Sequence, residues 1–268
     1  KDFEQHKNYI FINKNNCDLD HLPDCDYLVN FAAETHVDNS INDNDVFIKS
    51  NIQGIHNILK LIAAKDKKNR PRLFHISTDE VYGDILDGFY NEDSVLRPSN
   101  PYAATKASAD MLIKSWGRTY GIDWNIIRPS NNYGPLQFHE KLIPRSCQRL
   151  LNGYPAMLHG NGEYIRSWLH VEDNCEAIQL LIDEAKINNI YNIGSNEEIS
   201  NINVIDIICD HLKINIDERY VFVEDRSGQD LRYAIKYDKL KELGWTPKRR
   251  FKDSIKEIIE KHDISRFL

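Results

Sequence analysis

The sequence predicts an α/β protein with a doubly wound parallel sheet and a smaller mixed α/β region. Short apolar runs typical of buried strands alternate with segments of helical period, an order that requires parallel strands joined by crossover helices. The 268 residues are 41% hydrophobic, enough for one large domain or two small ones. Polar clusters follow three of the expected strands, where open α/β sheets bind their ligands.

The first half of the chain contains the clearest strand and helix signals. β-Branched and aromatic residues form short runs between polar turns and predict strands at residues 9–12, 26–31, 72–77 and 124–128. Apolar residues at spacings of three and four predict a long helix, on one stripe made of Val46, Ile48, Ile52, Ile55, Ile58, Leu59 and Ile62. Residues 102–120 predict a second long helix.

The alternation weakens in the second half of the chain. Short helices are expected near residues 141–151, 204–212 and 251–261, and a strand at 220–223. A strand at 190–193 is expected to rejoin the main sheet. We therefore divide the chain into a larger unit, residues 1–133 with 168–195, and a smaller unit packed over the strand ends, residues 134–167 with 196–268.

The composition limits the classes of function. Lys and Arg number 34 against 41 Asp and Glu, and a net charge of −7 argues against a general nucleic-acid or membrane-surface binder. Any anionic ligand must then be bound by a few placed cations. No run approaches the length of a transmembrane helix, and five scattered cysteines without Cys-x-x-Cys spacing predict reduced thiols, with no metal site. We expect a soluble, cytoplasmic protein.

Tyr102 and Lys106 are candidates for general base catalysis. The i,i+4 spacing places the phenol and the ammonium on one face of a helix start, where the cation should lower the tyrosine pKa. A second pair with this spacing, Tyr237 and Lys241, lies among charges near the C-terminus, and we expect it to be a surface pair.

Asp79 and Glu80 directly follow the strand expected at 72–77. Adjacent carboxylates at a strand end are commonly solvated loop residues. If both face one pocket, however, their repulsion keeps one protonated and provides an acid beside a base. An elimination needs such a pair, because one group removes a proton while the other protonates the leaving hydroxyl.

Six ordered motifs carry a family resemblance. They are Phe31–Ser40, Ser77–Gly83, Tyr102–Lys106, Arg128–Pro135, Gly160–Trp168 and Asp225–Arg232. Together they resemble the dTDP-glucose 4,6-dehydratases, which are extended short-chain dehydrogenases/reductases of the NAD-dependent epimerase/dehydratase type with a Rossmann sheet. The resemblance runs from about Asp18 to the end of the chain. It implies that the larger unit binds a dinucleotide and the smaller unit a nucleotide sugar.

The resemblance implies a catalytic role for five residues. Tyr102, assisted by Lys106, would take the proton of the sugar C4 hydroxyl while hydride passes to NAD, with Thr78 bonded to the C4 oxygen. Glu80 would then remove the C5 proton while Asp79 protonates the departing C6 hydroxyl. Transient NADH would return its hydride to C6. The product would be dTDP-4-keto-6-deoxyglucose plus water, which makes the enzyme a hydro-lyase of deoxysugar biosynthesis, rhamnose included.

The resemblance also implies two sets of binding residues. Cofactor contacts are expected from Ala32, Ala33, Glu34, Ser50, Tyr102, Lys106 and Asn132. Substrate contacts are expected from Thr35, Thr78, Asn131, Lys141, Leu142, Arg166, Asn201, Asp225, Arg226 and Gln229. Arg166 and Arg226 suit a diphosphate, because guanidinium forks match phosphate oxygens. Without its motif each arginine would be a surface ion pair, with Glu163 or Glu172 as the partner of Arg166. His36 and His170 are expected to be structural.

Other functions remain compatible with these motifs. The chain could be a UDP-glucose 4,6-dehydratase or another sugar-nucleotide epimerase or dehydratase, or a binder of nucleotide sugars without catalysis. Ser227 and Gln229 stand where the family has Pro and His, which leaves the choice of thymine or uracil open. A homodimer is implied, formed by the helices near 46–64 and 102–120 as a four-helix bundle, with Met111, Leu112 and Trp116 on the outer face.

The N-terminal region departs from the family. A Gly-x-x-Gly-x-x-Gly loop should hold the cofactor pyrophosphate after the first strand, yet no glycine precedes Asp26. Either an N-terminal strand–helix–strand is missing from the given chain, or the chain is a relative that binds no dinucleotide. We expect the former, because the catalytic set is complete.

Overall fold

The computed structural model describes residues 2–215, 219–225 and 227–261. Its strands are β1 (Tyr27–Asn30), β2 (Arg72–Ile76), β3 (Trp124–Pro129), β4 (Asn131–Tyr133), β5 (Ala156–His159), β6 (Ile165–His170), β7 (Asn189–Ile193), β8 (Glu198–Ser200) and β9 (Tyr220–Val223). Its α-helices are α1 (Val37–Asn42), α2 (Asn44–Phe47), α3 (Gly54–Ala64), α4 (Pro101–Tyr120), α5 (Leu142–Leu151), α6 (Val171–Glu184), α7 (Asn201–Leu212), α8 (Asp238–Glu242) and α9 (Phe251–Lys261). The π-helical segment η3 (Ile48–Gln53) joins α2 to α3, and short 3₁₀ turns are η1 (Asp2–Gln5), η2 (Asn16–Asp18), η4 (Lys67–Asn69) and η5 (Asp79–Tyr82).

The main sheet has the strand order β1-β2-β3-β7, and every pairing in it is parallel. The runs at 26–31, 72–77, 124–128 and 190–193 each form a strand of this sheet, as predicted. β7 pairs with β3 at the edge, with Ile190 opposite Ile126. The prediction that the chain returns to the sheet at 190–193 is therefore confirmed.

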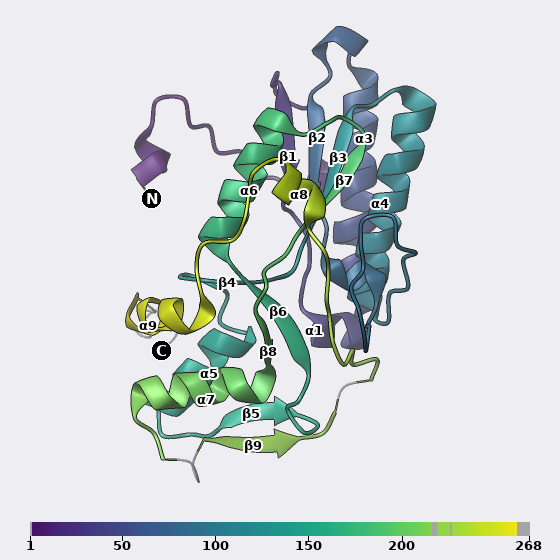
Figure 1. Ribbon diagram of the computed structural model, residues 1–268. Coiled ribbons are helices and arrows are strands. Elements are labelled where there is room, and N and C mark those ends of the chain that lie inside the picture. The colour runs from purple at the N-terminus through teal and green to yellow at the C-terminus, as the bar shows by residue number, and fades with distance from the viewer. Residues whose placement is uncertain (1, 216–218, 226, 262–268) are drawn as a thin grey trace.

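Helices cover both faces of this sheet, which confirms the doubly wound architecture. Figure 1 shows α3 and α4 on one side and α6 on the other. On the first side Ile58 and Ile62 of α3 pack with Ile113 of α4 against the sheet. On the other side Ala177 and Leu181 of α6 pack against the opposite faces of the same strands. β2 and β3 thus bury both faces, in agreement with their continuous apolar runs, whereas the edge strand β1 is only partly covered, with Tyr27 49% exposed.

The helix expected over 46–62 forms, but its apolar stripe divides at η3. Ile55, Ile58 and Ile62 are buried against the sheet, whereas Val46 and Ile48 are 47% and 40% exposed. A π-helical turn contains one more residue than an α-helical turn, so it rotates the side chains before it relative to those after it. The first two members of the predicted stripe therefore face outward.

The strand predicted at 9–12 is wrong. Tyr9, Ile10, Phe11 and Ile12 are outside every described strand, and Ile10 and Phe11 are 81% and 73% exposed. Their backbone bonds are local, from Tyr9 N to His6 O and from Lys14 N to Ile12 O. Apolar, β-branched composition favours a strand only where a neighbouring strand supplies the ladder bonds. No described strand lies beside this run.

A second group of elements lies beyond the carboxyl ends of the main sheet. β4, β6 and β8 form one small sheet and β5 pairs with β9, below the main sheet in the view of Figure 1. α5, α7 and α9 enclose their own core, in which Ile143, Leu158, Ile205 and Phe251 are buried. The short helices and the strand expected in this region are thus present. Between the two groups of elements lies the cleft described below.

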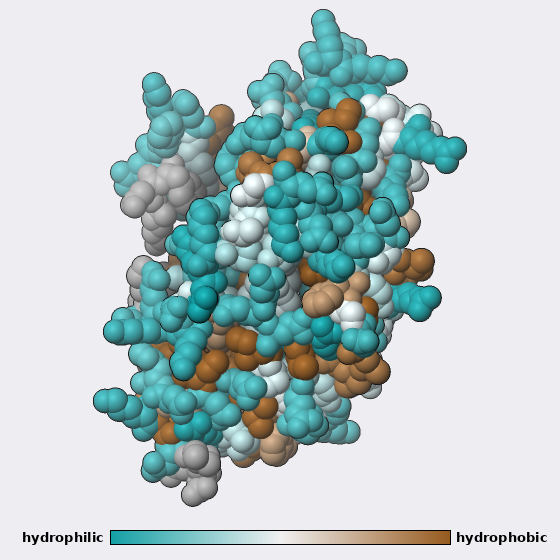
Figure 2. All heavy atoms as spheres, viewed as in Figure 1, coloured by the Kyte–Doolittle hydropathy of each residue, from teal (hydrophilic) through white to brown (hydrophobic). Residues whose placement is uncertain are grey.

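The surface is largely hydrophilic on the face that Figure 2 shows, and its hydrophobic residues gather mainly across the middle of that face. Within the described residues no helix has the length and apolar character needed to span a membrane. The five cysteines are all free thiols.

Candidate active site

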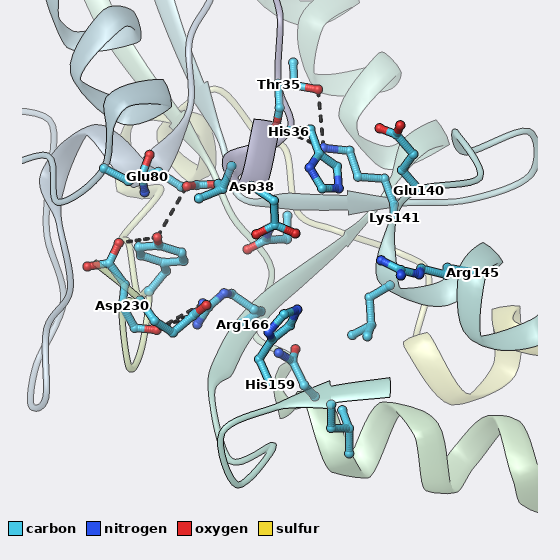
Figure 3. Close-up of a pocket in the computed structure, with 18 of the residues that line it drawn as sticks. Thr35, His36, Asp38, Glu80, Glu140, Lys141, Arg145, His159, Arg166 and Asp230 are labelled. Carbon is cyan, nitrogen blue, oxygen red and sulfur yellow. Dashed lines mark hydrogen bonds between the residues drawn. The ribbon is translucent and has the colours of Figure 1, made fainter. Parts of the chain in front are cut away.

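One cleft, with a volume of about 340 Å³, opens where the carboxyl ends of the main strands meet the second group of elements. Figure 3 shows side chains converging on it from the loop after β1, from η5, from the start of α5, from β5 and β6, and from the loop before α8. The predicted residues that line it are Thr35, Glu80, Asn131, Asn132, Lys141, Leu142, Arg166, Asn201 and Gln229. These nine come from segments as far as 194 positions apart (229 − 35), and the fold brings them together.

Thr78, Asp79 and Glu80 form a rigid turn at the end of β2. Thr78 is the N-cap of η5, with its Oγ1 accepting from the Glu80 N–H at 3.3 Å. The same hydroxyl donates to Asp79 Oδ1 at 3.3 Å. Asp79 is 2% exposed, and its Oδ2 has no hydrogen-bond partner among the described residues. The solvated-loop interpretation of this acidic pair is therefore wrong.

The two carboxyl groups have a raised affinity for protons. Burial, and then the charge of Glu80, raise the pKa of Asp79 to about 8, so Asp79 is an acid at neutral pH. Burial also raises the pKa of Glu80, although the charges of Arg166 and Lys141 oppose the shift. The Glu80 carboxylate lies 3.3 Å from the Tyr233 hydroxyl (Figure 3). A neutral acid beside a second carboxyl group that can act as a base is the arrangement that an elimination requires.

Tyr102 enters the site because of how α4 begins. Asn100 caps the helix by accepting from the Ala103 N–H at 2.9 Å, and Pro101 occupies its first turn. Tyr102 is 7% exposed, and burial together with the charge of Glu80 raises its pKa. The expected lowering of this pKa by Lys106 is wrong for this structure, because Lys106 is not among the groups that shift it.

The Lys106 amine points to the end of β2 instead. Its Nζ donates to the Ile76 carbonyl at 2.6 Å and lies 3.5 Å from His75 Nε2. Burial lowers the pKa of Lys106 to about 8, and the charge of Asp110 opposes this shift. Lys106 can therefore lose its proton at moderately alkaline pH.

A buried ion pair holds α4 against β3. Arg128 and Asp110 are 1% and 0% exposed, and the Arg128 guanidinium approaches Asp110 Oδ2 at 2.9 Å and 3.0 Å through two nitrogens. A third guanidinium nitrogen donates to the Tyr82 hydroxyl at 2.7 Å. This network fixes the helix that carries Tyr102 and Lys106 relative to the sheet.

The predicted cofactor residues lie along the loop after β1 and on the helices beside it. Ala32 and Glu34 are exposed, and Ala33 and Ser50 are half-buried. The Asn51 side chain binds both backbone groups of Glu34, at 2.8 Å and 3.0 Å, and so fixes this loop to η3. Asn132 Oδ1 is buried without a partner among the described residues. Small side chains and a fixed backbone beside an unused acceptor fit the nicotinamide end of a dinucleotide.

The cationic residues in the cleft have their own contacts. Lys141 Nζ donates to the Thr35 carbonyl at 3.0 Å. Arg166 donates to the Asp230 carbonyl at 3.0 Å and lies over the Tyr233 ring at 4.4 Å. The suggested pairing of Arg166 with Glu163 or Glu172 is wrong, because Glu163 accepts from Asn161 and Glu172 pairs with Arg249.

Nine described residues of the predicted sites lie outside the lining of the cleft: Ala32, Ala33, Glu34, Ser50, Thr78, Asp79, Tyr102, Lys106 and Asp225. Thr78 is buried, and Asp225 accepts from the Tyr164 hydroxyl. Arg226 lies outside the described residues.

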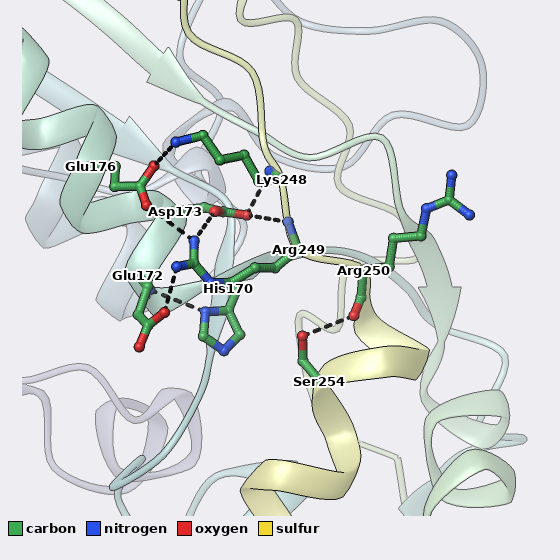
Figure 4. A network of polar contacts seen from close by, with 8 residues as sticks. All are labelled: His170, Glu172, Asp173, Glu176, Lys248, Arg249, Arg250 and Ser254. Carbon is green, nitrogen blue, oxygen red and sulfur yellow. Dashed lines mark hydrogen bonds and ion pairs between the residues drawn. The ribbon is translucent and has the colours of Figure 1, made fainter.

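The two histidines singled out in the sequence differ in their surroundings. His36 lines the cleft. His170 caps α6, with its Nδ1 accepting from the Glu172 N–H at 3.2 Å. It belongs to the network of Figure 4, in which Arg249 binds Glu172 and Asp173 and so attaches the segment before α9 to α6. His170 therefore has the structural role expected of it.

The second Tyr-Lys pair is not a surface pair. Tyr237 is 3% exposed, packs in the core on the α6 side of the sheet, and donates to Asn196 at 2.9 Å. Only Lys241 is exposed, with its ammonium 4.5 Å from the centre of the Tyr237 ring.

Sequence reasoning missed several residues of the cleft. They are Asp38, Asn100, Gln137, Glu140, Arg145, Met157, His159, Asp230 and Tyr233. Gln137, Glu140 and Arg145 are close in sequence to predicted residues, so the motif that ends at Pro135 could have been extended to include them. His159 and Tyr233 also adjoin predicted motifs, since His159 directly precedes Gly160 and Tyr233 directly follows Arg232.

Comparison with known proteins gives a consistent result. The family model described as GDP-mannose 4,6 dehydratase matches residues 4–258. The low-salt glycan biosynthesis protein Agl12 of Haloferax volcanii is 44% identical over 241 residues, covering 90% of this chain and 76% of that protein. The dTDP-glucose 4,6-dehydratase of Salmonella typhimurium is 40% identical over 258 residues, covering 88% and 72%.

A solved structure agrees in fold. The chain resembles DesIV, a dTDP-glucose 4,6-dehydratase of Streptomyces venezuelae whose crystal structure contains NAD and dTDP. The TM-score is 0.86 and the identity 39%, over 90% of this chain and 74% of DesIV.

Proposed function

The chain belongs to the GDP-mannose 4,6 dehydratase family, and from that premise we propose that it is an NDP-glucose 4,6-dehydratase. It converts dTDP-glucose to dTDP-4-keto-6-deoxyglucose and water, as a hydro-lyase of deoxysugar biosynthesis that uses NAD. The observation that carries this proposal is the buried Asp79 next to Glu80 at the cleft. An epimerase or a decarboxylase does not expel the C6 hydroxyl and has no need of this acid.

Four side chains carry the chemistry in this proposal. Thr78 binds the C4 oxygen, and Tyr102 takes the proton of the C4 hydroxyl as the 4-keto group forms. That ketone acidifies the C5 hydrogen, so Glu80 removes it while Asp79 gives its proton to the C6 hydroxyl, which leaves as water. Glu80 later returns a proton to C5. Tyr102 then releases to solvent the proton that it took from the C4 hydroxyl. Asp79 takes up a proton from solvent, so both groups return to their starting states.

Lys106 assists Tyr102 in this sequence through its charge. A buried phenol whose pKa is raised stays protonated at neutral pH, so it needs a nearby positive charge to become the phenolate base. We propose that the Lys106 amine moves from the Ile76 carbonyl toward Tyr102 in the loaded enzyme, as an ammonium. The lowered pKa of Lys106, about 8, allows the group to gain or lose a proton near neutral pH.

The cofactor supplies the redox part of the chemistry: when bound, NAD accepts a hydride from C4 and returns it to C6. In the proposal Ala32, Ala33, Glu34, Ser50, Tyr102, Lys106 and Asn132 hold it. The fixed backbone of Glu34 and the unused Asn132 acceptor support this placement.

The nucleotide sugar is proposed to lie along the cleft with its diphosphate near Arg166 and Lys141. Thr35, Asn131, Leu142, Asn201 and Gln229 line the same cleft. The family resemblance adds Asp225 and Arg226, which precede Gln229 in the sequence. The apolar side chains of Met157 and Leu158 lie on β5, on the far side of the cleft from the main sheet, and suit a pyrimidine base.

The test is turnover of dTDP-glucose and UDP-glucose by the protein supplied with NAD, with products identified by mass and NMR. We expect a 4-keto-6-deoxy product and no net NADH, and Asp79→Asn should reduce the rate by about 10² to 10⁴. Asp183→Asn, on the exposed face of α6, is the matched control. A C4 epimer as the only product would support the epimerase alternative, and binding of dTDP-glucose without turnover would support a non-catalytic binder.

Three further features are part of the proposal. Residues 1–133 with 168–195 form the dinucleotide-binding unit, and 134–167 with 196–268 the nucleotide-sugar unit, a division that the separate core under α5, α7 and α9 supports. The chain forms a homodimer, supported by 47% exposure of Val46 on α2 and 45% exposure of Met111 on α4. A cytoplasmic location fits the five free thiols.

A further inference from the structure

Gln137 is a residue of the cleft that the motifs do not include. It lies in the loop between β4 and α5, and its side-chain Nε2 donates to the Asn132 carbonyl at 2.9 Å. A backbone carbonyl only accepts hydrogen bonds, so the NH₂ group must be the end that faces Asn132. The orientation of this amide is thereby fixed, and its oxygen is directed away from Asn132.

The free end of that amide is unsatisfied. Oε1 of Gln137 is buried from solvent and has no hydrogen-bond partner among the described residues. A buried acceptor without a donor is unfavourable, and most such atoms in folded proteins are paired. At a ligand cleft, the missing donor is expected to come from the ligand.

The backbone next to Gln137 is also strained. Leu136 has φ +65° and a side chain that is 79% exposed. The other two described non-glycine residues with positive φ have local reasons, because Lys213 ends α7 and Asn188 binds the backbone N–H of Trp124. Leu136 has neither, and such strain persists mainly where function requires it. Leu136 thus has an unfavourable backbone conformation, and the next residue, Gln137, has a buried acceptor without a donor.

The place of Gln137 indicates which part of the ligand it meets. Its bond to Asn132 ties it to β4, which follows β3 of the main sheet after Ser130 alone, and not to β5 on the far side of the cleft. On the proposed function, the sugar C4 and C6 hydroxyls are bound by Tyr102, Thr78 and Asp79. The hydroxyls at C2 and C3 are then left for the remaining acceptors of the cleft, and Gln137 Oε1 is one that no described residue satisfies.

We propose that Gln137 is a specificity-determining residue, whose Oε1 accepts a hydrogen bond from a non-reacting sugar hydroxyl at C2 or C3. This inference rests on the proposed function, because it takes the ligand to be a nucleotide glucose. Gln137 selects for a hexose that has this hydroxyl.

The test is a set of calorimetric dissociation constants for dTDP-glucose, its 2-deoxy and 3-deoxy analogues, and dTDP. The wild-type protein should bind one deoxy analogue about 10-fold more weakly than dTDP-glucose, in line with one lost hydrogen bond. Gln137→Met should bind dTDP-glucose about 10-fold more weakly and should no longer distinguish that analogue, while its affinity for dTDP is unchanged. Gln179→Met, on the exposed face of α6, should behave like the wild type.

Two results would overturn the inference. One is equal binding of dTDP-glucose and both deoxy analogues by the wild type, a result that does not depend on how well any variant folds. The other is unchanged discrimination in Gln137→Met with weakened NAD binding, which would assign Oε1 to the cofactor. Turnover of dTDP-glucose by the same wild-type protein separates a failure of this inference from a failure of the proposed function.

Discussion

At the residue scale, Asp79 combines a catalytic use with a cost in stability. Burial raises its pKa from an ordinary 3.8 to about 8, so in this pH range the folded protein holds a proton that the unfolded chain releases. The stability that this proton provides is complete below about pH 4 and is lost as the pH rises through 8. A group kept protonated for catalysis therefore makes the protein less stable at neutral and alkaline pH.

We expect Asp79→Asn to melt at a higher temperature than the wild type at pH 8, by several degrees, because each kcal/mol is worth about 2–4 °C in a chain of this size. The difference should shrink toward pH 4, where the wild-type carboxyl is protonated in both states. Thermal unfolding of both proteins from pH 4 to 9, with Asp183→Asn as control, measures this. Equal melting temperatures at every pH would contradict the raised pKa.

The rate should depend on pH through the same two carboxyl groups. Asp79 must hold its proton to expel the C6 hydroxyl, so kcat/KM should fall above about pH 8, where Lys106 also loses its charge. Glu80 must be ionised, and because its pKa is raised above 4.5, the acid limb should lie above that value. A profile of kcat/KM from pH 5 to 10 measures both limbs. A rate that continues to rise above pH 9 would contradict these assignments.

The sequence predicted the identities of the reacting groups better than their surroundings. The order of residues placed Asp79 and Glu80 after a strand, and the fold brings Glu80 to the cleft and buries Asp79 next to it. Local spacing could not predict where the Lys106 amine points, because the Ile76 carbonyl and His75 that face it belong to β2, far from Lys106 in sequence. The sequence could not single out Gln137 for a similar reason. Its distinguishing feature is a side-chain oxygen that is buried without a hydrogen-bond donor, and this results from the packing of the folded chain.

At the scale of elements, the position of α4 depends on the buried pair between Arg128 and Asp110. Helix and strand have their own local causes, a capped start for α4 and an apolar run for β3. The position of α4 relative to β3 is set by the charged groups of Arg128 and Asp110, which are buried from solvent. The pair therefore positions Tyr102 and Lys106 without touching the substrate.

We expect Arg128→Met to lower the free energy of unfolding by about 3–5 kcal/mol, because it leaves the Asp110 carboxylate buried without its partner. The double variant with Asp110→Leu should recover part of this loss, since it removes the stranded charge. Denaturant unfolding of the wild type, both single variants and the double variant measures the coupling. If the double variant loses the sum of the two single losses, the pair is not coupled as described.

Helices and strands were predictable where a single hydrophobic pattern determined the type of the segment. The four strands of the main sheet and the helix α4 are continuous apolar or amphipathic segments, and each forms close to where it was expected. The strand at 9–12 failed because a strand needs a neighbour, which composition does not supply. The apolar stripe over 46–62 divides because a π-helical turn rotates the side chains before it relative to those after it. The residue types in Ile48–Gln53 do not predict such a turn.

At the scale of the whole molecule, the fold places two cores on either side of one cleft and leaves an outer helical face partly apolar. α2 and α4 contact each other, and Val46 and Met111 project from them to solvent. A second copy packed on this face would cover them without closing the cleft, in line with the proposed dimer.

Sedimentation velocity tests the dimer. Val46→Glu combined with Met111→Glu should convert the protein to monomers, because two buried charges without partners disfavour an apolar interface. Leu86→Glu, at a residue that is 74% exposed in the loop after η5, is the control and should leave the oligomeric state unchanged. A wild-type monomer at micromolar concentration would contradict the proposal.

The central claim is that oxidation at C4 and reduction at C6 occur in one active site around the elimination by Asp79 and Glu80. It is tested most directly with dTDP-glucose deuterated at C4, converted by the protein supplied with NAD and analysed by mass and NMR. We predict that the deuterium appears at C6 of the 4-keto-6-deoxy product, and that solvent hydrogen appears at C5. Deuterium that is retained at C4, or lost to free NADH, would contradict the account.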